Sequence, residues 1–340
     1  MVEQVANIYE IAEVVLPERL VRDDLRKAAD ILTAHEARFL VDMYYTMQET
    51  RKRSANQVRA LTSSGEPNDC VQHFTRESVK FEGDLRYALG RYAAAQRIGQ
   101  WAQSITGIGP VISAGLMAHI DIEKAPTVGH IWRFAGLDPN SDWKGRVKAE
   151  AIVKEHLGKR KPTPEDVLAI SQKMNGIGYE AALRHATTKN DGSPRDLTAD
   201  SIASAFALRP WNAKLKTLCW KIGESFVKVS NHPDDIYGHI YAERKLQEQD
   251  RSLQGDYKDQ AEAKAAKVGK GTEAYKAYSI GQLPPAHLHA RAERYATKLF
   301  LAHWHHVAYA SHFGKPPPKP YVIEHMGHAH YIAPPNWPMS

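Results

Sequence analysis

A glycine pair that occurs twice is the feature of this sequence that most restricts its fold. The chain reads SITGIGPVISAGLMAHI from Ser104 to Ile120, and a related stretch, KMNGIGYEAALRHA, runs from Lys173 to Ala186. In each copy, Gly-Ile-Gly stands before small and apolar residues at helical spacing. Glycine tolerates backbone angles that a side chain would forbid, as a tight turn between two helices requires. The pattern predicts two helix-hairpin-helix units.

Such a turn also exposes backbone. The N–H groups at the start of the following helix have no partner within the helix, and together with the helix dipole they suit a phosphate oxygen. We therefore expect nucleic-acid contacts at Gly107, Gly109 and Ser113 in the first copy and at Gly176 and Gly178 in the second. The alternative is that each glycine pair only caps one helix and packs it against the next.

The repeat extends beyond the glycines. TVGHIWRFAGLDP (127–139) and TADSIASAFALRP (198–210) keep Thr, Ile, Leu and Pro at the same offsets. Each unit therefore reads as a hairpin followed by a helix that closes at Leu-x-Pro, where proline prevents continuation. Two hairpins related by a pseudo-dyad would contact both strands of a duplex, although a repeat of purely structural origin explains the same pattern.

The rest of the chain predicts an all-α fold. Apolar residues at helical spacing indicate a long amphipathic helix over 33–61 and a second one through Trp101, which would pair as a hairpin. We expect four parts: an N-terminal helical hairpin (1–104), a tandem helix-hairpin-helix core (105–253), a charged insertion (254–280) and a C-terminal helix and tail rich in histidine and aromatic residues (281–340).

The composition limits the kinds of binding partner that we expect. The net charge of +6 and the pI of about 9.1 favour an anionic partner. The two cysteines form no disulfide framework or metal motif. The sequence shows no apolar run of membrane length and no leader sequence, so we expect a cytoplasmic protein with no membrane partner. We also expect no cofactor. The N-terminal hairpin is a candidate homodimer interface.

The loop after the first unit carries the candidate chemistry. A base-excision site would use Asp138 or Asp142 to stabilise positive charge on the sugar, whereas a strand-joining site would use Ser141 as nucleophile. In either case the expected DNA contacts are Trp143, Lys144 and Arg146. The structural alternative is a helix cap with local ion pairs.

Histidines gather near the C-terminus, where nine of the 17 lie between His287 and His330. We expect His303 and His306, from the stretch HWHH, to contact DNA or to be packed in the core. No HExxH motif or cysteine partner accompanies them, so no metal site is predicted there.

The run GIGPVISAGLMAHIDIEKAPTVGHIWRFAGLDP, with NAKLKTLCWKIGESFVKVS and ATKLFLAHWHH downstream, resembles the C-terminal domain of DEDD-type RNA-guided insertion-sequence transposases. The resemblance implies a DNA-processing role with DNA, and alternatively RNA, as partner. The family's nuclease domain with its four carboxylates has no counterpart in the helical first 105 residues, so an autonomous transposase is not expected.

APTVGHIWRF is also similar to the Pro-Val-Asp and His-Ile-x-Arg elements of helix-hairpin-helix DNA glycosylases, but Gly129 stands near the place of their catalytic Asp. Three functions follow: a transposase-derived protein that binds or joins DNA, a base-excision enzyme for damaged or modified DNA such as that of phage, and a helical scaffold for protein partners.

Overall fold

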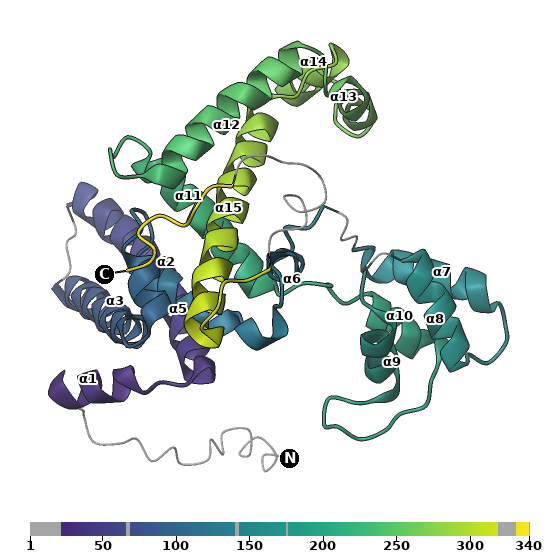
Figure 1. The fold of residues 1–340 in the computed structure, drawn as a ribbon, viewed down its shortest axis with the longest axis horizontal. Helices are drawn as coiled ribbons and strands as arrows, with labels where there is room; N and C mark the ends of the chain where they lie inside the picture. The colour runs from purple at the N-terminus through teal and green to yellow at the C-terminus, as the bar shows by residue number, and fades with distance from the viewer. Residues whose placement is uncertain (1–21, 66–68, 140–142, 175, 319–330, 340) are drawn as a thin grey trace.

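The chain is helical throughout the part that the structure describes (Figure 1). This computed structural model describes residues 22–65, 69–139, 143–174, 176–318 and 331–339. These residues form no strand, and their one isolated β-bridge pairs Thr188 with Pro194. The prediction of an all-α fold is confirmed.

The larger unit, here called the body, contains most of the helices. They are α1 (Arg22–Asp30), α2 (Ala34–Ser63), α3 (Asp69–Ala94), α4 (Arg97–Gln103), α5 (Pro110–His119), the 3-10 helix η1 (Ile122–Lys124), α6 (Val128–Phe134), α11 (Ala213–Val229), α12 (Ile236–Leu253) and α15 (Pro285–Phe313). Large apolar side chains from α4, α11, α12 and α15 meet in one core, where Trp101 stacks on Phe300 with ring centroids 5.9 Å apart.

The expected long helical hairpin is formed by α2 and α3, which pack side by side (Figure 1). Its second helix is shorter than expected: α3 ends at Ala94, the backbone is extended at Gln96, and Trp101 lies on the separate helix α4. A capping box starts α2: the Thr33 hydroxyl accepts from the N–H of Glu36, and the Glu36 carboxylate accepts from the N–H of Thr33. An ion pair of 2.5 Å between Arg51 and Glu82 joins the two helices farther along. The hairpin packs on α5 and so supports the first glycine turn.

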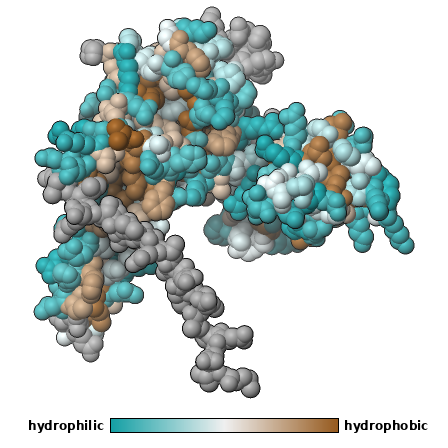
Figure 2. Space-filling view, turned by 90° about the horizontal axis from the view of Figure 1, so that it is seen from below, coloured by the Kyte–Doolittle hydropathy of each residue, from teal (hydrophilic) through white to brown (hydrophobic). Residues whose placement is uncertain are grey.

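Four short helices make a second unit, here called the small bundle: α7 (Gly145–Leu157), α8 (Pro164–Lys173), α9 (Tyr179–Thr187) and α10 (Ala199–Phe206). They enclose their own apolar cluster, in which Val153, Ile170 and Ile202 are almost fully buried. The bundle stands to one side of the body in Figure 1, and Figure 2 shows its surface as mostly hydrophilic with one hydrophobic band. The two glycine pairs therefore begin helices of two different apolar clusters.

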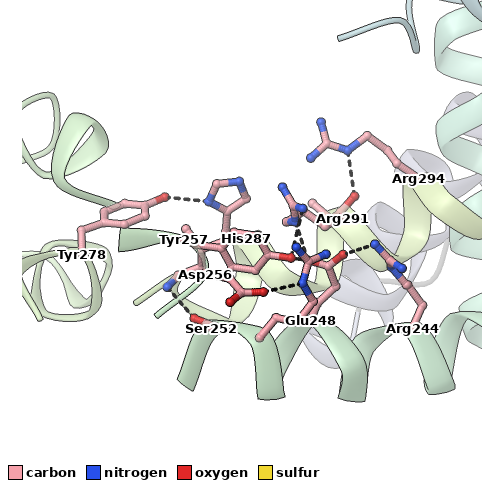
Figure 3. Close-up of polar contacts among 12 residues, drawn as sticks. Arg244, Glu248, Ser252, Asp256, Tyr257, Tyr278, His287, Arg291 and Arg294 are labelled. Carbon is pink, nitrogen blue, oxygen red and sulfur yellow. Dashed lines mark hydrogen bonds and ion pairs between the residues drawn. The ribbon is translucent and has the colours of Figure 1, made fainter. Parts of the chain in front are cut away.

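A third cluster lies at the far end of α12 and α15. The charged stretch expected as an insertion folds into α13 (Lys258–Ala265) and α14 (Glu273–Ser279), which bury Tyr257 and Tyr278 against the start of α15. Beneath them Glu248, 1% exposed, accepts hydrogen bonds from the Tyr257 hydroxyl at 2.5 Å and from Arg291 Nε at 2.6 Å (Figure 3).

Arg244 lies 2.6 Å from the other oxygen of the Glu248 carboxylate, so this buried charge is fully paired (Figure 3). The network fastens the α13–α14 pair to the body. The division of the chain into four parts that the sequence suggested stays a prediction, because these three apolar clusters do not test it. Among the described helices, none has both the length and the apolar character needed to cross a membrane.

Candidate nucleic-acid interface

The first glycine turn joins α4 to α5 and requires its first glycine for conformational reasons. Gly107 has φ +89°, and a Cβ added there would lie 3.2 Å from Val229 Cγ2. The Ser225 hydroxyl donates to the Gly107 carbonyl at 2.5 Å, which fixes the turn against α11. Gly109, by contrast, has φ −88° and open space where a side chain would stand.

Gly109 is the N-cap of α5, and Pro110 occupies the first position of that helix. A hollow beside Pro110 is lined in part by Arg86 and Arg91 of α3. Arg91 is already paired with Asp30 at 2.6 Å. The first turn thus combines a bare helix N-terminus with a basic neighbour, which is the setting that suits a phosphate group.

The second glycine turn leads from α8 into α9. Gly178 is the N-cap of α9, again with open space at its Cβ position. Arg133, on α6 of the body, donates to the carbonyl of Gly176 at 3.4 Å. This contact places the second turn beside the last helix of the first repeat.

Two residues expected to touch DNA lie inside the protein. Ser113 is fully buried, and its hydroxyl donates to the carbonyl of Gly99 at 3.2 Å. His303 is 3% exposed, with Nδ1 2.7 Å from the Tyr237 hydroxyl and Nε2 2.8 Å from the carbonyl of Ile332. Burial prevents both side chains from touching a macromolecule, so of the two explanations for His303 the structure matches core packing. Neither residue is carried into the interface.

His306, one position on from the buried His305, is half-buried and lies 3.4 Å from the hydroxyl of Tyr331. Burial lowers the pKa of His306. An imidazole that remains neutral at physiological pH offers little attraction to a phosphate.

The loop predicted to carry chemistry is described only in part, because Ser141 and Asp142 lie outside the described residues. Arg146 is occupied within the small bundle: its guanidinium contacts Glu150 and Asp200 at 2.5 Å each and also Ser204. The contact with Asp200 joins α7 to α10. The expected pairing of Asp142 with Lys144 or Arg146 stays a prediction, because Asp142 lies outside the described residues.

Two tryptophans meet where the body joins the small bundle, and a third lies on α6, whose end is hydrogen-bonded to the same link; each of the three faces a cation. Trp143 lies under Arg209 at 5.0 Å, Trp211 under Lys216 at 4.1 Å and Trp132 under Lys298 at 4.2 Å, measured to the ring centroids. The rings of Trp143 and Trp211 are 6.4 Å apart. These six residues are here called the tryptophan–cation cluster; the sequence pattern had identified only Trp143 among them.

Hydrogen bonds hold the rings of the cluster. Trp143 Nε1 donates to the carbonyl of Ala207 at 2.8 Å, and Trp132 Nε1 donates to that of Lys298 at 3.1 Å. Gly136, with φ +66°, lets Trp211 approach so closely that a Cβ would meet the ring at 2.8 Å. The aromatic faces are therefore preorganised on packed helices and helix ends.

The cations of the cluster repel one another. Partial burial lowers the pKa of Lys216, and the positive charges of Arg209 and Arg294 lower it further. Burial also lowers the pKa of Lys298; there Asp138 opposes the shift, and Arg294 adds to it. Like charges held together at a protein surface create a field that attracts an anion.

An exposed aromatic side chain extends the cluster along α11. Trp220 follows Lys216 by one helical turn and is 57% exposed. A large aromatic ring so open to water and next to cations is a surface on which a nucleic-acid base stacks well.

Comparison with known proteins gives one family match. Residues 99–156 match the family model described as Transposase IS116/IS110/IS902 family. The matched stretch runs from α4 through the first glycine turn and α6 into α7. Searches of curated proteins and of solved structures returned no match. This segment is thus related to a transposase domain, which confirms that part of the resemblance; RNA guidance and the likeness to glycosylases stay predictions.

Proposed function

We propose that this transposase-related protein binds nucleic acid, with DNA as the first candidate, through the tryptophan–cation cluster and the two glycine turns. The observation that carries the proposal is the cluster itself: three tryptophan rings, each paired with a cation, lie on and beside the two links between the body and the small bundle, and two of the rings are in contact. Lysine and arginine neutralise phosphates, and tryptophan stacks on bases.

The position of the cluster supports the same conclusion. Trp132 and Trp143 lie within the segment that matches the transposase family, whereas Arg209 ends the second repeat and Trp211 and Lys216 follow it. Arg133 links α6 to the second glycine turn, so the turn and the cluster flank one helix. A strand lying along this junction would meet phosphate-binding groups and stacking rings together.

The test is binding of fluorescently labelled duplex and single-stranded oligonucleotides, DNA and RNA, by anisotropy over a range of salt concentrations. Lys216→Ala should weaken binding and reduce the slope of log K against log salt by about 0.7 to 0.9, because one phosphate fewer is neutralised by the protein. Lys270→Ala, an exposed lysine on the α13–α14 pair, is the matched control and should bind as the wild type does.

Stacking is tested separately. Trp220→Ala should weaken binding to single strands more than to duplexes, because paired bases are not free to stack on it. Equal affinities for the wild type, Lys216→Ala and Trp220→Ala at every salt concentration would overturn the proposal. If the wild type binds none of the oligonucleotides but does bind a protein partner, the scaffold function is favoured instead.

A further inference from the structure

A carboxylate pair and an imidazole meet between α11 and α15, outside the tryptophan–cation cluster. Glu224 comes from α11, and His289 and Glu293 come from α15 one helical turn apart. One ligand atom from each residue lies within 4.8 Å of the others. Three ligands around a tetrahedral ion with bonds of about 2.1 Å are about 3.4 Å apart, so small side-chain rotations close the set.

One oxygen of the Glu293 carboxylate, Oε1, is buried without a hydrogen bond to any of the described residues. The Glu293 side chain as a whole is 9% exposed. An unpaired buried carboxylate oxygen is costly, and an ion is one of the few groups that satisfy it. Burial, followed by the negative charge of Glu224, raises the pKa of Glu293.

The fold makes room for this carboxylate. A Cβ on Gly223, the neighbour of Glu224, would lie 2.4 Å from Cγ and 2.6 Å from Oε1 of Glu293. Only a glycine at this position lets the Glu293 side chain cross the face of α11 toward Glu224. Lys228, 3.5 Å from Glu224, is 71% exposed and can leave for the solvent.

The imidazole has the support that metal-binding histidines usually have. Nδ1 of His289 lies 2.7 Å from the hydroxyl of Tyr241 on α12, while Nε2 lies 3.8 Å from Oε2 of Glu293. With an ion on Nε2, Nδ1 carries the hydrogen and donates it to the Tyr241 oxygen. Such an outer contact fixes the ring and its tautomer.

We propose that Glu224, His289 and Glu293 bind one divalent transition-metal ion of the manganese, iron or zinc type. One nitrogen and two carboxylate oxygens suit these ions, whereas magnesium prefers oxygen ligands alone. Three protein ligands leave positions for water. The ion would join α11 to α15 and neutralise the two carboxylates, independently of any nucleic acid.

The test uses the purified full-length protein without a tag, stripped by chelator and titrated with Mn²⁺ or Zn²⁺ by calorimetry. Because the chain has 17 histidines, the difference between the wild type and Glu224→Gln is what counts. The wild type should bind one equivalent more, with a higher melting temperature in the presence of the ion. Glu262→Gln, on the exposed surface of α13, should match the wild type.

Tyr241→Phe separates a metal site from a plain histidine–carboxylate contact. The substitution keeps the buried ring and removes only the hydroxyl beside His289, so metal affinity should fall about 10- to 100-fold while the fold without metal persists by circular dichroism. The proposal is overturned if Glu224→Gln binds as many equivalents of metal as the wild type. It is also overturned if the ion shifts the melting temperatures of the two proteins by the same amount.

Discussion

The two glycines of the first turn should respond differently to a methyl group. In Gly107→Ala, a side chain is forced onto a residue with φ +89°, which costs about 1 to 2 kcal/mol. The added Cβ would also stand 3.2 Å from Val229 and 3.3 Å from Phe226, and crowding of a packed core costs about 1 to 3 kcal/mol. We expect Gly107→Ala to lower the free energy of unfolding by about 2 to 5 kcal/mol.

Gly109→Ala is the matched control. With φ −88° and open space at its Cβ, it should change the free energy of unfolding by less than about 0.5 kcal/mol. Urea unfolding followed by far-ultraviolet circular dichroism and tryptophan fluorescence measures both values. Equal denaturation midpoints for the two variants would refute the conclusion that the fold requires glycine at position 107 and does not require it at position 109.

Three further predictions test binding, pH dependence and charge. Gly109→Val and Gly178→Val should each weaken duplex binding for all sequences alike in anisotropy titrations without a large loss of stability, because the backbone that a phosphate approaches is covered. Burial lowers the pKa of His303 to about 4, against about 6.5 when unfolded, so the unfolded chain binds more protons between these values and stability falls as the pH drops. Between pH 7 and pH 5 this group should remove about 2 kcal/mol, and urea unfolding of His303→Gln should show a correspondingly weaker dependence on pH. Asp138→Asn should raise DNA affinity modestly, because the negative charge near Lys298 is removed, and should abolish base release if Asp138 is the catalytic carboxylate; unchanged affinity would place Asp138 away from the bound phosphates.

Local features of the fold could be predicted from the sequence because their causes are local. The turn at Gly107 follows from the freedom of glycine, and the start of α2 follows from Thr33 and Glu36 three residues later. Helical spacing likewise predicted α2 and α3, although it continued the second helix through Trp101, which lies on α4. Each of these features depends on residues within a few positions of one another.

The tryptophan–cation cluster could not be predicted in the same way. Its residues come from α6, the link before α7, the link after α10, α11 and α15, and no periodicity relates Trp132 to Lys298. The histidine stretch shows that residues close together in sequence can differ in burial for reasons that lie far away in the chain. His303 and His306 are one turn apart on α15, yet His303 is buried beside Tyr237 of α12 and the carbonyl of Ile332.

The position of the small bundle explains why the cluster joins both repeats. Segments that come before and after the small bundle in the chain pack together in the body; for example, Ser225 of α11 donates a hydrogen bond to the carbonyl of Gly107. The bundle is therefore inserted between α6 and α11, and the chain enters it at Trp143 and leaves it toward Trp211. The 6.4 Å contact of these two rings lies across both links. A nucleic-acid strand bound as proposed would contact both links at once, so its binding would fix the bundle, and with it the second glycine turn, relative to the body.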